Sequence, residues 1–495
     1  MDWLEEHWLR LVFVIAYLAM LVHHCWEGQR TTSLPESDGQ DRGKSTIGRF
    51  LNGGGRLGGW VIALSFYATF VSTNTFIGHA GKSWDVGLIW YVKLAVYALT
   101  VYLAWYLVAP RFIILARQYN SLTVADFLGH RYQSVAVRRV AAAVILVGSV
   151  LYLVAVYKAS SIALQEFLGI KYQVAAVAIF LVVTAYTLAG GFRAVVRTDA
   201  VQGLLMAVGA VALLVAVIFH GGGLMTILGK VRDYDPELVS WRGKLPLMSI
   251  FGLALAGGMK LLVDPRQISR FYGLMDHPDK RALRVAQIVA PLLILITYIC
   301  TLPIGALAHA LIPADAISDS DHVVPYLLGS SQIFGPILSS FFLMVLLSAA
   351  MSSLDSVLLV AASSVGRDLL MIDAEDSRTI AHTRLWVIPV SLVSLLLALN
   401  PFGDVVEITA FSGSLYAACF LPTLVVGMYW KRATATGALA CMLVGSATVI
   451  GWYIAEKAKW TSLHEVYVGL VVAITAYVGV SVLTSPAGRD EVSNG

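Results

Sequence analysis

Charged residues are scarce in this 495-residue sequence, since Asp, Glu, Lys and Arg together make up only 13% of it. A soluble domain usually carries about 25% charged residues, so about half of the charge that a water-facing surface needs is missing. Hydrophobic residues make up 58% and gather into long runs with short polar segments between them. Runs of roughly 20 apolar residues match the hydrocarbon thickness of a bilayer. The composition excludes a soluble multidomain protein and predicts an all-α integral membrane protein.

Cysteine is scarce as well, and the sequence shows no cluster that would do chemistry. The four cysteines lie in or beside apolar segments, without the spacing of metal ligands or paired loops, and are interpreted as small core residues: Cys25, Cys300, Cys419 and Cys441. We find no nucleophile–base pair and no group of metal ligands, so an enzyme is not expected. The first residues are acidic where a secretory signal would be basic, and the first apolar segment is expected to be retained.

Hydropathy predicts about thirteen membrane-spanning helices. They are expected at Trp8–Trp26, Trp60–Gly81, Leu88–Ile114, Val140–Ala163, Val174–Gly191, Asp199–His220, Leu247–Tyr272, Val285–Ile312, Ile333–Val365, Leu385–Leu399, Val405–Tyr429, Thr434–Ala455 and Val466–Leu483.

The distribution of Lys and Arg among the short loops predicts the orientation in the membrane. Basic residues gather in the first, third, fifth and seventh loops: Arg42, Lys44, Arg49 and Arg56; Arg117, Arg131, Arg138 and Arg139; Arg193 and Arg197; Arg270, Lys280, Arg281 and Arg284. The intervening loops are weaker or acidic, although the loop 221–244 is mixed in charge. By the positive-inside rule the odd loops are cytoplasmic, the N-terminus lies outside and the C-terminus lies in the cytoplasm.

Ionisable side chains inside apolar spans cost roughly 2.5–3.5 kcal/mol each on insertion scales, so each needs a reason. The candidates are Lys93, Lys158, Asp199, Lys260, Asp264 and Asp355. Lys93 and Lys158 lie near the ends of their spans and are expected to extend toward the membrane interface. Asp199, Lys260 and Asp355 are candidate functional residues. Asp199 and Asp355 could equally be structural, bonded to nearby hydroxyls and arginines.

Small and hydroxylated residues cluster in the middle of one span, from Ser348 to Ser356, with the carboxylate of Asp355 beside them. Such a cluster allows close helix packing, in which hydroxyls bond between helices. It would also suit a hard cation such as sodium, which needs several oxygen ligands, and nothing in it suits a transition metal.

Two spans carry signs of an interrupted helix, which is the usual pointer to the binding site of a transporter. Thr69–Thr75, in the middle of the second span, is rich in hydroxyl and amide groups. A second interruption is predicted at Gly257-Gly258, just before Lys260. The two spans are five apart in sequence, as an inverted five-plus-five repeat requires.

Several segments resemble those of the solute:sodium symporter family, which includes sodium-coupled carriers of sugars, proline, pantothenate, monocarboxylates and sialic acid. The resemblance extends from about Trp60 to Arg432 and is carried by Thr123–Tyr132, Gly190–Gln202, Gln267–Phe271 and the Ser352-Ser353 span. It implies a single transporter domain with the leucine-transporter fold and alternating access. The inverted repeats would occupy 60–220 and 247–430, preceded by an extra helix and cytoplasmic loop (1–59) and followed by C-terminal helices and a short tail (431–495).

The resemblance also implies two cation sites. The family's main sodium site falls on the backbone carbonyls of Ala68, Val71 and Ala349. Its remaining ligands are the hydroxyls of Ser352 and Ser353. A second site, found in some members, falls on residues that match Asp199, Asp355 and Ser356. Some members have serine at the position of Asp355, and the extra carboxylate could strengthen sodium binding there or make the site titratable.

The solute is less clearly indicated than the ion. Sugar-carrying members place amide, carboxylate and aromatic groups where this chain has Thr75, Leu94, Gly257, Lys260 and Leu261. This departure argues against a hexose. Members of the sialic acid type hold a carboxylate with hydroxyls that match Ser72 and Thr75. The candidate substrate-binding residues are therefore Ser72, Thr73, Asn74, Thr75, Gly257 and Lys260. Lys260 could pair with a carboxylate of the solute, or with Asp264 four residues later in the same helix.

These observations predict a sodium-coupled symporter of the plasma membrane that imports a small, carboxylate-bearing solute, such as a monocarboxylate, an amino acid, pantothenate or a sugar acid. Solute, sodium ions and the bilayer are the expected partners, nucleic acid is not, and the oligomeric state stays open. The alternatives are a proton-coupled carrier that uses Asp199 or Asp355, a sugar or polyol carrier, and a membrane protein that senses a solute.

Overall fold

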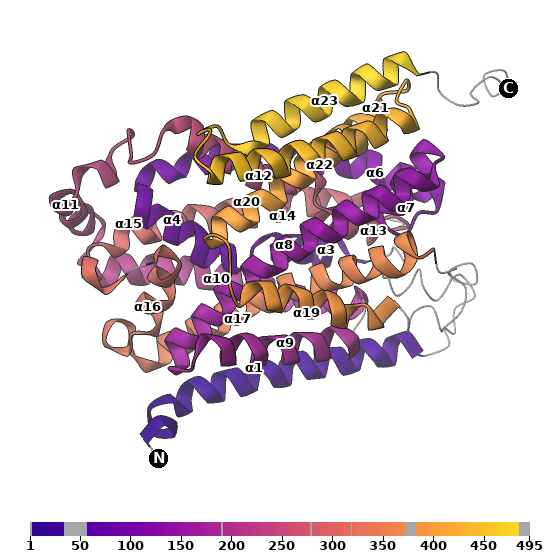
Figure 1. The fold of residues 1–495 in the computed structure, drawn as a ribbon. Coiled ribbons are helices and arrows are strands. Elements are labelled where there is room, and N and C mark those ends of the chain that lie inside the picture. The colour runs from indigo at the N-terminus through magenta and orange to yellow at the C-terminus, as the bar shows by residue number, and fades with distance from the viewer. Residues whose placement is uncertain are drawn as a thin grey trace.

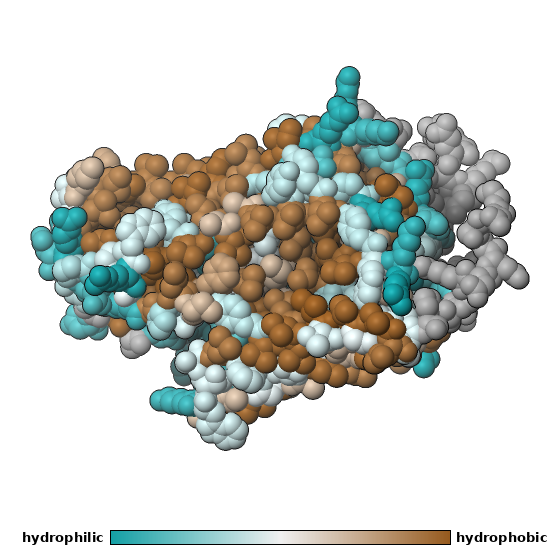
Figure 2. Space-filling model, turned by 90° about the horizontal axis from the view of Figure 1, so that it is seen from above, coloured by the Kyte–Doolittle hydropathy of each residue, from teal (hydrophilic) through white to brown (hydrophobic). Residues whose placement is uncertain are grey.

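The computed structural model describes residues 2–33, 57–189, 192–277, 280–317, 319–371 and 383–484. Within these ranges ten helices are long and apolar enough to cross a membrane, and a bent pair of helices makes an eleventh span. Two shorter apolar helices, His7–His23 and Thr383–Ala398, coincide with the two remaining predicted spans. The surface in Figure 2 is hydrophobic across its middle and hydrophilic toward both ends, as a bilayer requires.

A long helix, α1 (Asp2–Ser33), precedes the first group of five spans. The elements of this group are α3 (Gly59–Phe70), η2 (Asn74–Gly78) and α4 (His79–Val86); η3 (Leu88–Tyr91), α5 (Val92–Leu103), η4 (Ala104–Val108) and α6 (Ala109–Tyr119); α8 (Val135–Leu168); α9 (Tyr172–Ala189); and α10 (Phe192–His220). A short helix, α7 (Val124–Tyr132), connects α6 to α8.

Two short helices, α11 (Leu224–Tyr234) and η5 (Pro236–Val239), lead to the second group of five spans. Its elements are α12 (Leu247–Val263) and α13 (Pro265–Tyr272); α14 (Lys280–Thr301) and α15 (Ile304–Ala308); α17 (Ser331–Ser363) and η8 (Ser364–Leu369); α19 (Val387–Ala398); and α20 (Val405–Phe420), η9 (Leu421–Val426) and α21 (Gly427–Tyr429). Between α15 and α17 lie η6 (Ala314–Ala316), η7 (Ser320–His322) and α16 (Val323–Gly329), and the chain continues into α22 (Ala435–Lys457) and α23 (Glu465–Leu483).

Each group of five begins with a broken span, and the two broken spans run in opposite directions, as Figure 1 shows for α3–α4 and α12–α13. Helix α1 begins at one end of the molecule and α23 finishes at the other (Figure 1). Both broken spans lie against buried helices, because α3 packs on α10, α14 and α17, and α12 packs on α5 and α20. This arrangement brings the interrupted backbone segments to the centre of the protein.

Some predictions concern residues outside the described ranges. The basic residues of the first loop, Arg42, Lys44, Arg49 and Arg56, lie there, as do Gly190 and Gly191 and the side chains of Cys25 and Arg193. The cysteines whose side chains are described, Cys300, Cys419 and Cys441, are buried and free.

Candidate functional site

The first broken span is interrupted where the hydroxyl-rich segment predicts it. Helix α3 ends at Phe70, Val71 adopts an extended conformation with φ −74° and ψ 116°, and the chain bends by 54° before η2 begins at Asn74. Side-chain oxygens replace the missing helical partners. The backbone N–H of Asn74 donates to Ser72 Oγ at 3.2 Å, and the backbone N–H of Ser72 donates to Thr75 Oγ1 at 3.3 Å. Backbone polar groups inside a membrane must be satisfied in this way.

Oxygen atoms of α17 meet this break. Ser352 Oγ lies 3.1 Å from the carbonyl oxygen of Ala68 and 3.4 Å from that of Ala349. Ser353 Oγ is fully buried and has no hydrogen-bond partner among the described residues. Three of the five residues expected at the main sodium site are thus joined by contacts, and a fourth presents a hydroxyl with unused bonding capacity. A hard cation prefers oxygen donors of this kind.

The second broken span is interrupted at a different residue from the predicted one. Helix α12 continues through Gly257 and Gly258 to Val263, and the break falls at Asp264, which is extended with φ −64° and ψ 123°. Pro265 explains this position, because proline disfavours helical conformation in the preceding residue. Gly257 and Gly258 serve close packing instead: a Cβ on Gly257 would lie 2.3 Å from Tyr97 Oη, and one on Gly258 would lie 2.9 Å from Val96 Cγ1.

Asp264 and Arg266 stabilise this second break together. Asp264 caps α13 by accepting the Arg266 amide at 3.0 Å, and both of its carboxylate oxygens contact the Arg266 guanidinium, at 3.0 and 2.7 Å. Arg266 also donates to the Thr69 carbonyl at 3.4 Å, which connects the two breaks. The predicted alternative of a pair between Lys260 and Asp264 is therefore wrong, because Asp264 is already engaged by an arginine.

The carboxylates proposed for the second cation site lie in one buried polar cluster. Asp199 Oδ2 accepts from Ser65 Oγ at 2.7 Å and from Arg270 Nη2 at 3.0 Å. Arg270 Nη2 also lies 2.5 Å from Ser356 Oγ, which lies 3.3 Å from Asp355 Oδ1. Asp199 thus has the structural partners that its alternative interpretation requires. Nevertheless, Asp199 Oδ1 and Asp355 Oδ2 are both buried without a partner among the described residues, so the cluster retains two free carboxylate oxygens.

A narrow cavity of about 20 Å³ lies between the two breaks. Four of the six predicted substrate-binding residues line it: Ser72, Asn74, Gly257 and Lys260. Thr73 and Thr75 do not line it. The Thr75 hydroxyl is instead bonded to the Tyr298 hydroxyl, with 3.1 Å between Oγ1 and Oη. Aromatic and basic residues that we did not predict complete the lining, among them Phe70, His79, Lys93, Tyr97, Tyr152, Arg266 and Tyr298.

The sequence led us to expect that Lys93 and Lys158 extend toward the membrane interface. In the structure they do not. Lys93 is 1% exposed and faces the cavity, with its Nζ 3.4 Å from His79 Nδ1. Lys158 Nζ contacts Asp321 at 2.5 Å and the Gly403 carbonyl at 3.2 Å. Lys93 finds its partner 14 residues earlier, on α4, whereas Lys158 finds its partners 163 and 245 residues later, and these contacts keep both lysines inside the protein.

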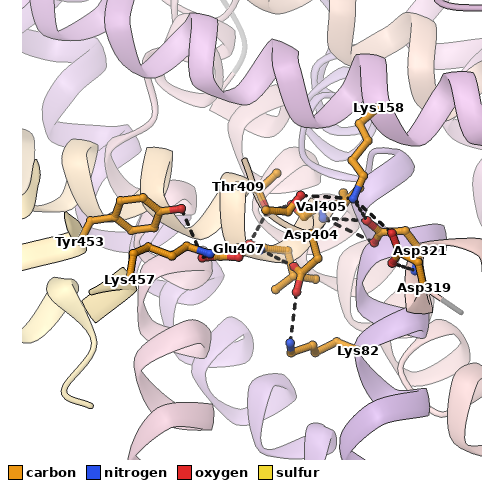
Figure 3. A network of polar contacts seen from close by, with 12 residues as sticks. Lys82, Lys158, Asp319, Asp321, Asp404, Val405, Glu407, Thr409, Tyr453 and Lys457 are labelled. Atoms are coloured by element: carbon orange, nitrogen blue, oxygen red, sulfur yellow. Dashed lines mark hydrogen bonds and ion pairs between the residues drawn. The ribbon is translucent and has the colours of Figure 1, made fainter. Parts of the chain in front are cut away.

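The contact between Lys158 and Asp321 belongs to a polar network at the end of the protein that is predicted to be extracellular (Figure 3). Asp404 accepts from Lys82 at 3.2 Å, and Asp321 also accepts the Val405 amide at 3.1 Å. Burial raises the pKa of the Asp321 carboxyl to about 6. These contacts join α4 and α8 to the start of α20.

A second polar network lies among α7, α8 and η8. Thr123 caps α7 and donates to Asp368 at 2.8 Å, and Arg138 contacts Asp368 at 2.8 Å and Asp126 at 3.3 Å. The Thr123–Tyr132 motif therefore joins the connection before α8 to η8, which follows α17.

Comparisons with known proteins agree with this geometry. A family model described as the sodium:solute symporter family matches residues 50–445. Similar relatives include the osmoregulated proline transporter OpuE of Bacillus subtilis, 29% identical over 95% of this chain and 94% of the relative, and the high-affinity proline transporter PutP of the same organism, 30% identical over 89% and 93%. The sodium/pantothenate symporter of Haemophilus influenzae is 29% identical over 88% and 91%.

Among solved structures, the chain is similar to a sodium-coupled sialic acid symporter in a substrate-bound outward-open state, with a TM-score of 0.78 and 19% identity over 97% of this chain and 99% of that one. A nucleobase-cation-symport-1 family transporter in a closed conformation gives a TM-score of 0.54 at 12% identity over 89% and 96%. The fold is thus that of the leucine-transporter class, as predicted. The chain belongs to the sodium:solute symporter family and is a sodium-coupled, multi-pass membrane transporter rather than an enzyme.

Proposed function

We propose that the protein imports a small carboxylate-bearing solute together with sodium, by alternating access, across the plasma membrane with its N-terminus outside and its C-terminus in the cytoplasm. The observation that carries this proposal is Lys260, a buried cation that lines the cavity and forms no ion pair among the described residues. Its Nζ donates to the Thr409 carbonyl at 3.2 Å and lies 4.2 Å from the Tyr152 ring centre, which leaves its charge without a counter-ion.

The relatives are compatible with such a solute. Their names specify proline, pantothenate and sialic acid, and each of these molecules carries one carboxylate at neutral pH. A hexose or polyol offers no negative charge to Lys260, so the alternative of a sugar or polyol carrier leaves that residue unexplained.

Sodium is a co-substrate in the proposed cycle. It would bind between the first break and α17, on the carbonyls of Ala68, Val71 and Ala349 and the hydroxyls of Ser352 and Ser353. Because its ligands come from both elements, bound sodium stabilises the arrangement in which Ser72 and Asn74 face the cavity. One sodium ion that moves down about 100 mV and a tenfold gradient supplies about 3.7 kcal/mol, enough for accumulation of several hundred-fold.

The cluster of Asp199, Asp355 and Ser356 would hold a second sodium ion. Its support is the pair of buried carboxylate oxygens that lack a partner among the described residues. Arg270 already neutralises one of the two carboxylates, so this site would carry about one net negative charge, which suits a single monovalent cation.

The test is the thermal stability of the purified protein against a solute panel, in sodium buffer and in choline buffer, followed by uptake into proteoliposomes. A ligand of the folded state raises the unfolding midpoint by mass action. We expect carboxylate solutes to raise it only with sodium, and to be taken up. Stabilisation by neutral sugars would contradict the proposed solute class. Binding without uptake would favour a solute sensor.

A further inference from the structure

The cavity carries more positive charge than its surroundings neutralise. Three basic residues line it, Lys93, Lys260 and Arg266, and its described lining contains no Asp or Glu. Asp264 neutralises Arg266 through both of its carboxylate oxygens. The two lysines remain without a carboxylate within ion-pair distance in the described part of the chain.

Lys93 is held on the side of the cavity formed by α4 and α5. Its Nζ lies 3.4 Å from His79 Nδ1, 4.5 Å from the Trp90 ring centre and 5.5 Å from that of Tyr97. An imidazole nitrogen and two aromatic faces stabilise an ammonium group, but none of them carries negative charge. The residue is 1% exposed, so bulk water does not replace the missing counter-ion.

Lys260 is held on the side of the cavity formed by α12 and α20. It is 4% exposed, its Nζ donates to the Thr409 carbonyl, and the Tyr152 ring lies beneath it. The two ammonium groups are thus anchored to different helices, and each has one neutral acceptor and an aromatic face. The cavity is also lined by Phe70, Tyr97 and Tyr298, whose rings suit a short carbon skeleton.

We propose that the solute carries two acidic groups, and that Lys93 binds one of them while Lys260 binds the other. This inference rests on the proposed function and narrows its solute to a short-chain dicarboxylate, with or without an amino group. A single carboxylate neutralises one buried ammonium group and leaves the second uncompensated, which is costly inside a membrane protein. Two carboxylates joined by a few carbons would pair with both lysines.

The test compares acids that differ by one charge and hardly in shape. Malonate, succinate, glutarate and aspartate are each titrated against the corresponding monoamide, with the purified full-length protein in sodium buffer and the unfolding midpoint as readout. We expect one diacid to bind about tenfold or more tightly than its own monoamide, because the monoamide leaves one lysine unpaired. The preferred chain length then reports the separation of the two lysines.

Two variants locate the effect. Lys93→Met and Lys260→Met should each bring the affinity for the diacid down to that for its monoamide, because each leaves one cationic site. The matched control is Lys457→Met, which removes a lysine that is 45% exposed and paired with Glu407 in the outer network. The control should keep the preference for the diacid. Stabilisation of each variant by sodium alone verifies that it is folded.

The outcomes separate this inference from the proposed function. Monoamides or other monocarboxylates that bind as tightly as diacids, and do so only with sodium, overturn the two-acid inference and leave the proposed function intact. An unchanged preference in Lys93→Met or Lys260→Met also overturns it. If no carboxylate of either series binds in sodium, both proposals fail.

Discussion

Ser352 Oγ lies 3.1 Å from the carbonyl oxygen of Ala68, although 284 residues separate the two in sequence. The contact exists because α3 ends at Phe70 and its last carbonyls are released from helical bonding. A cation placed here would connect the broken span to α17. Sodium bound here would therefore be coupled to the shape of the neighbouring cavity through the same short backbone segment.

Replacing Ser353 by alanine should weaken sodium binding without unfolding the protein. The substitution removes a buried hydroxyl that has no hydrogen-bond partner among the described residues. We expect the sodium concentration for half-maximal uptake to rise about tenfold, the equivalent of about 1.4 kcal/mol. Ser340→Ala is the control, because Ser340 lies on the same helix and its hydroxyl donates to the Pro336 carbonyl at 2.7 Å. Equal sodium dependence of the two variants would contradict the site.

Replacing Asp199 by asparagine should destabilise the protein strongly, whether or not this residue binds a cation. The substitution removes the carboxylate that pairs with Arg270 at 3.0 Å, and both side chains are at most 2% exposed. Breaking a buried pair costs about 3 kcal/mol or more. The comparison is Asp235→Asn, which breaks an exposed pair with Lys244 at 2.6 Å and should cost at most about 1 kcal/mol. Denaturation in detergent measures both; similar losses would argue against a structural role of Asp199.

The elements of this fold could be predicted from the sequence because each span is recognisable by its own composition. The first break and the Ser352-Ser353 segment were also predictable, since hydroxyl groups in the middle of an apolar run have few structural uses. The second break shows where such reasoning failed. Two glycines drew attention to positions 257 and 258, whereas the proline at position 265, which releases Asp264 from the helix, was the stronger signal.

The partners of the buried lysines could not be predicted in the same way. Lys158 contacts Asp321, 163 residues away, and the spacing of either residue within its own element gives no sign of the other. Lys93 faces the cavity rather than lipid because α5 packs against α12. Its place near the end of an apolar run suggested the opposite. Contacts between distant helices depend on how the bundle is assembled, and hydropathy along the sequence does not predict them.

Replacing Gly257 by alanine should lower solute affinity through packing. A Cβ at this position would lie 2.3 Å from Tyr97 Oη, so α5 and α12 must move apart or Tyr97 must turn into the cavity. We expect the solute concentration for half-maximal uptake to rise about tenfold. The double variant Gly257→Ala/Tyr97→Phe removes the clashing oxygen and should recover most of the loss. Gly451→Ala on α22, where a Cβ meets nothing within 4 Å, should behave like the parent protein.

Protonation of Asp321 should make stability depend on pH between about 4 and 6. Burial raises the pKa of this carboxyl from 3.8 to about 6 in the folded protein. The folded state therefore binds more protons than the unfolded state in this range. The group's contribution to stability is fully present below pH 3.8 and is lost as the pH rises through 6.

The Asp321→Asn variant lacks this contribution. Its free energy of unfolding should therefore increase less than that of the parent protein when the pH is lowered from 7 to 5, by roughly 1 kcal/mol per pH unit at most. The Asp321→Asn variant also lacks the charge that Lys158 contacts, so the network around Lys158 and Asp404 should be looser in this variant at pH 7. The opening is measured by the accessibility of a cysteine introduced at Leu253. This residue lines the cavity and also the neighbouring pocket that Lys82, Asp404 and Glu407 line. Asp315→Asn, on an exposed residue of the same connection, is the control. If the Leu253→Cys protein is labelled equally fast with and without the Asp321→Asn substitution at every pH, the contact between Lys158 and Asp321 does not close the outer end.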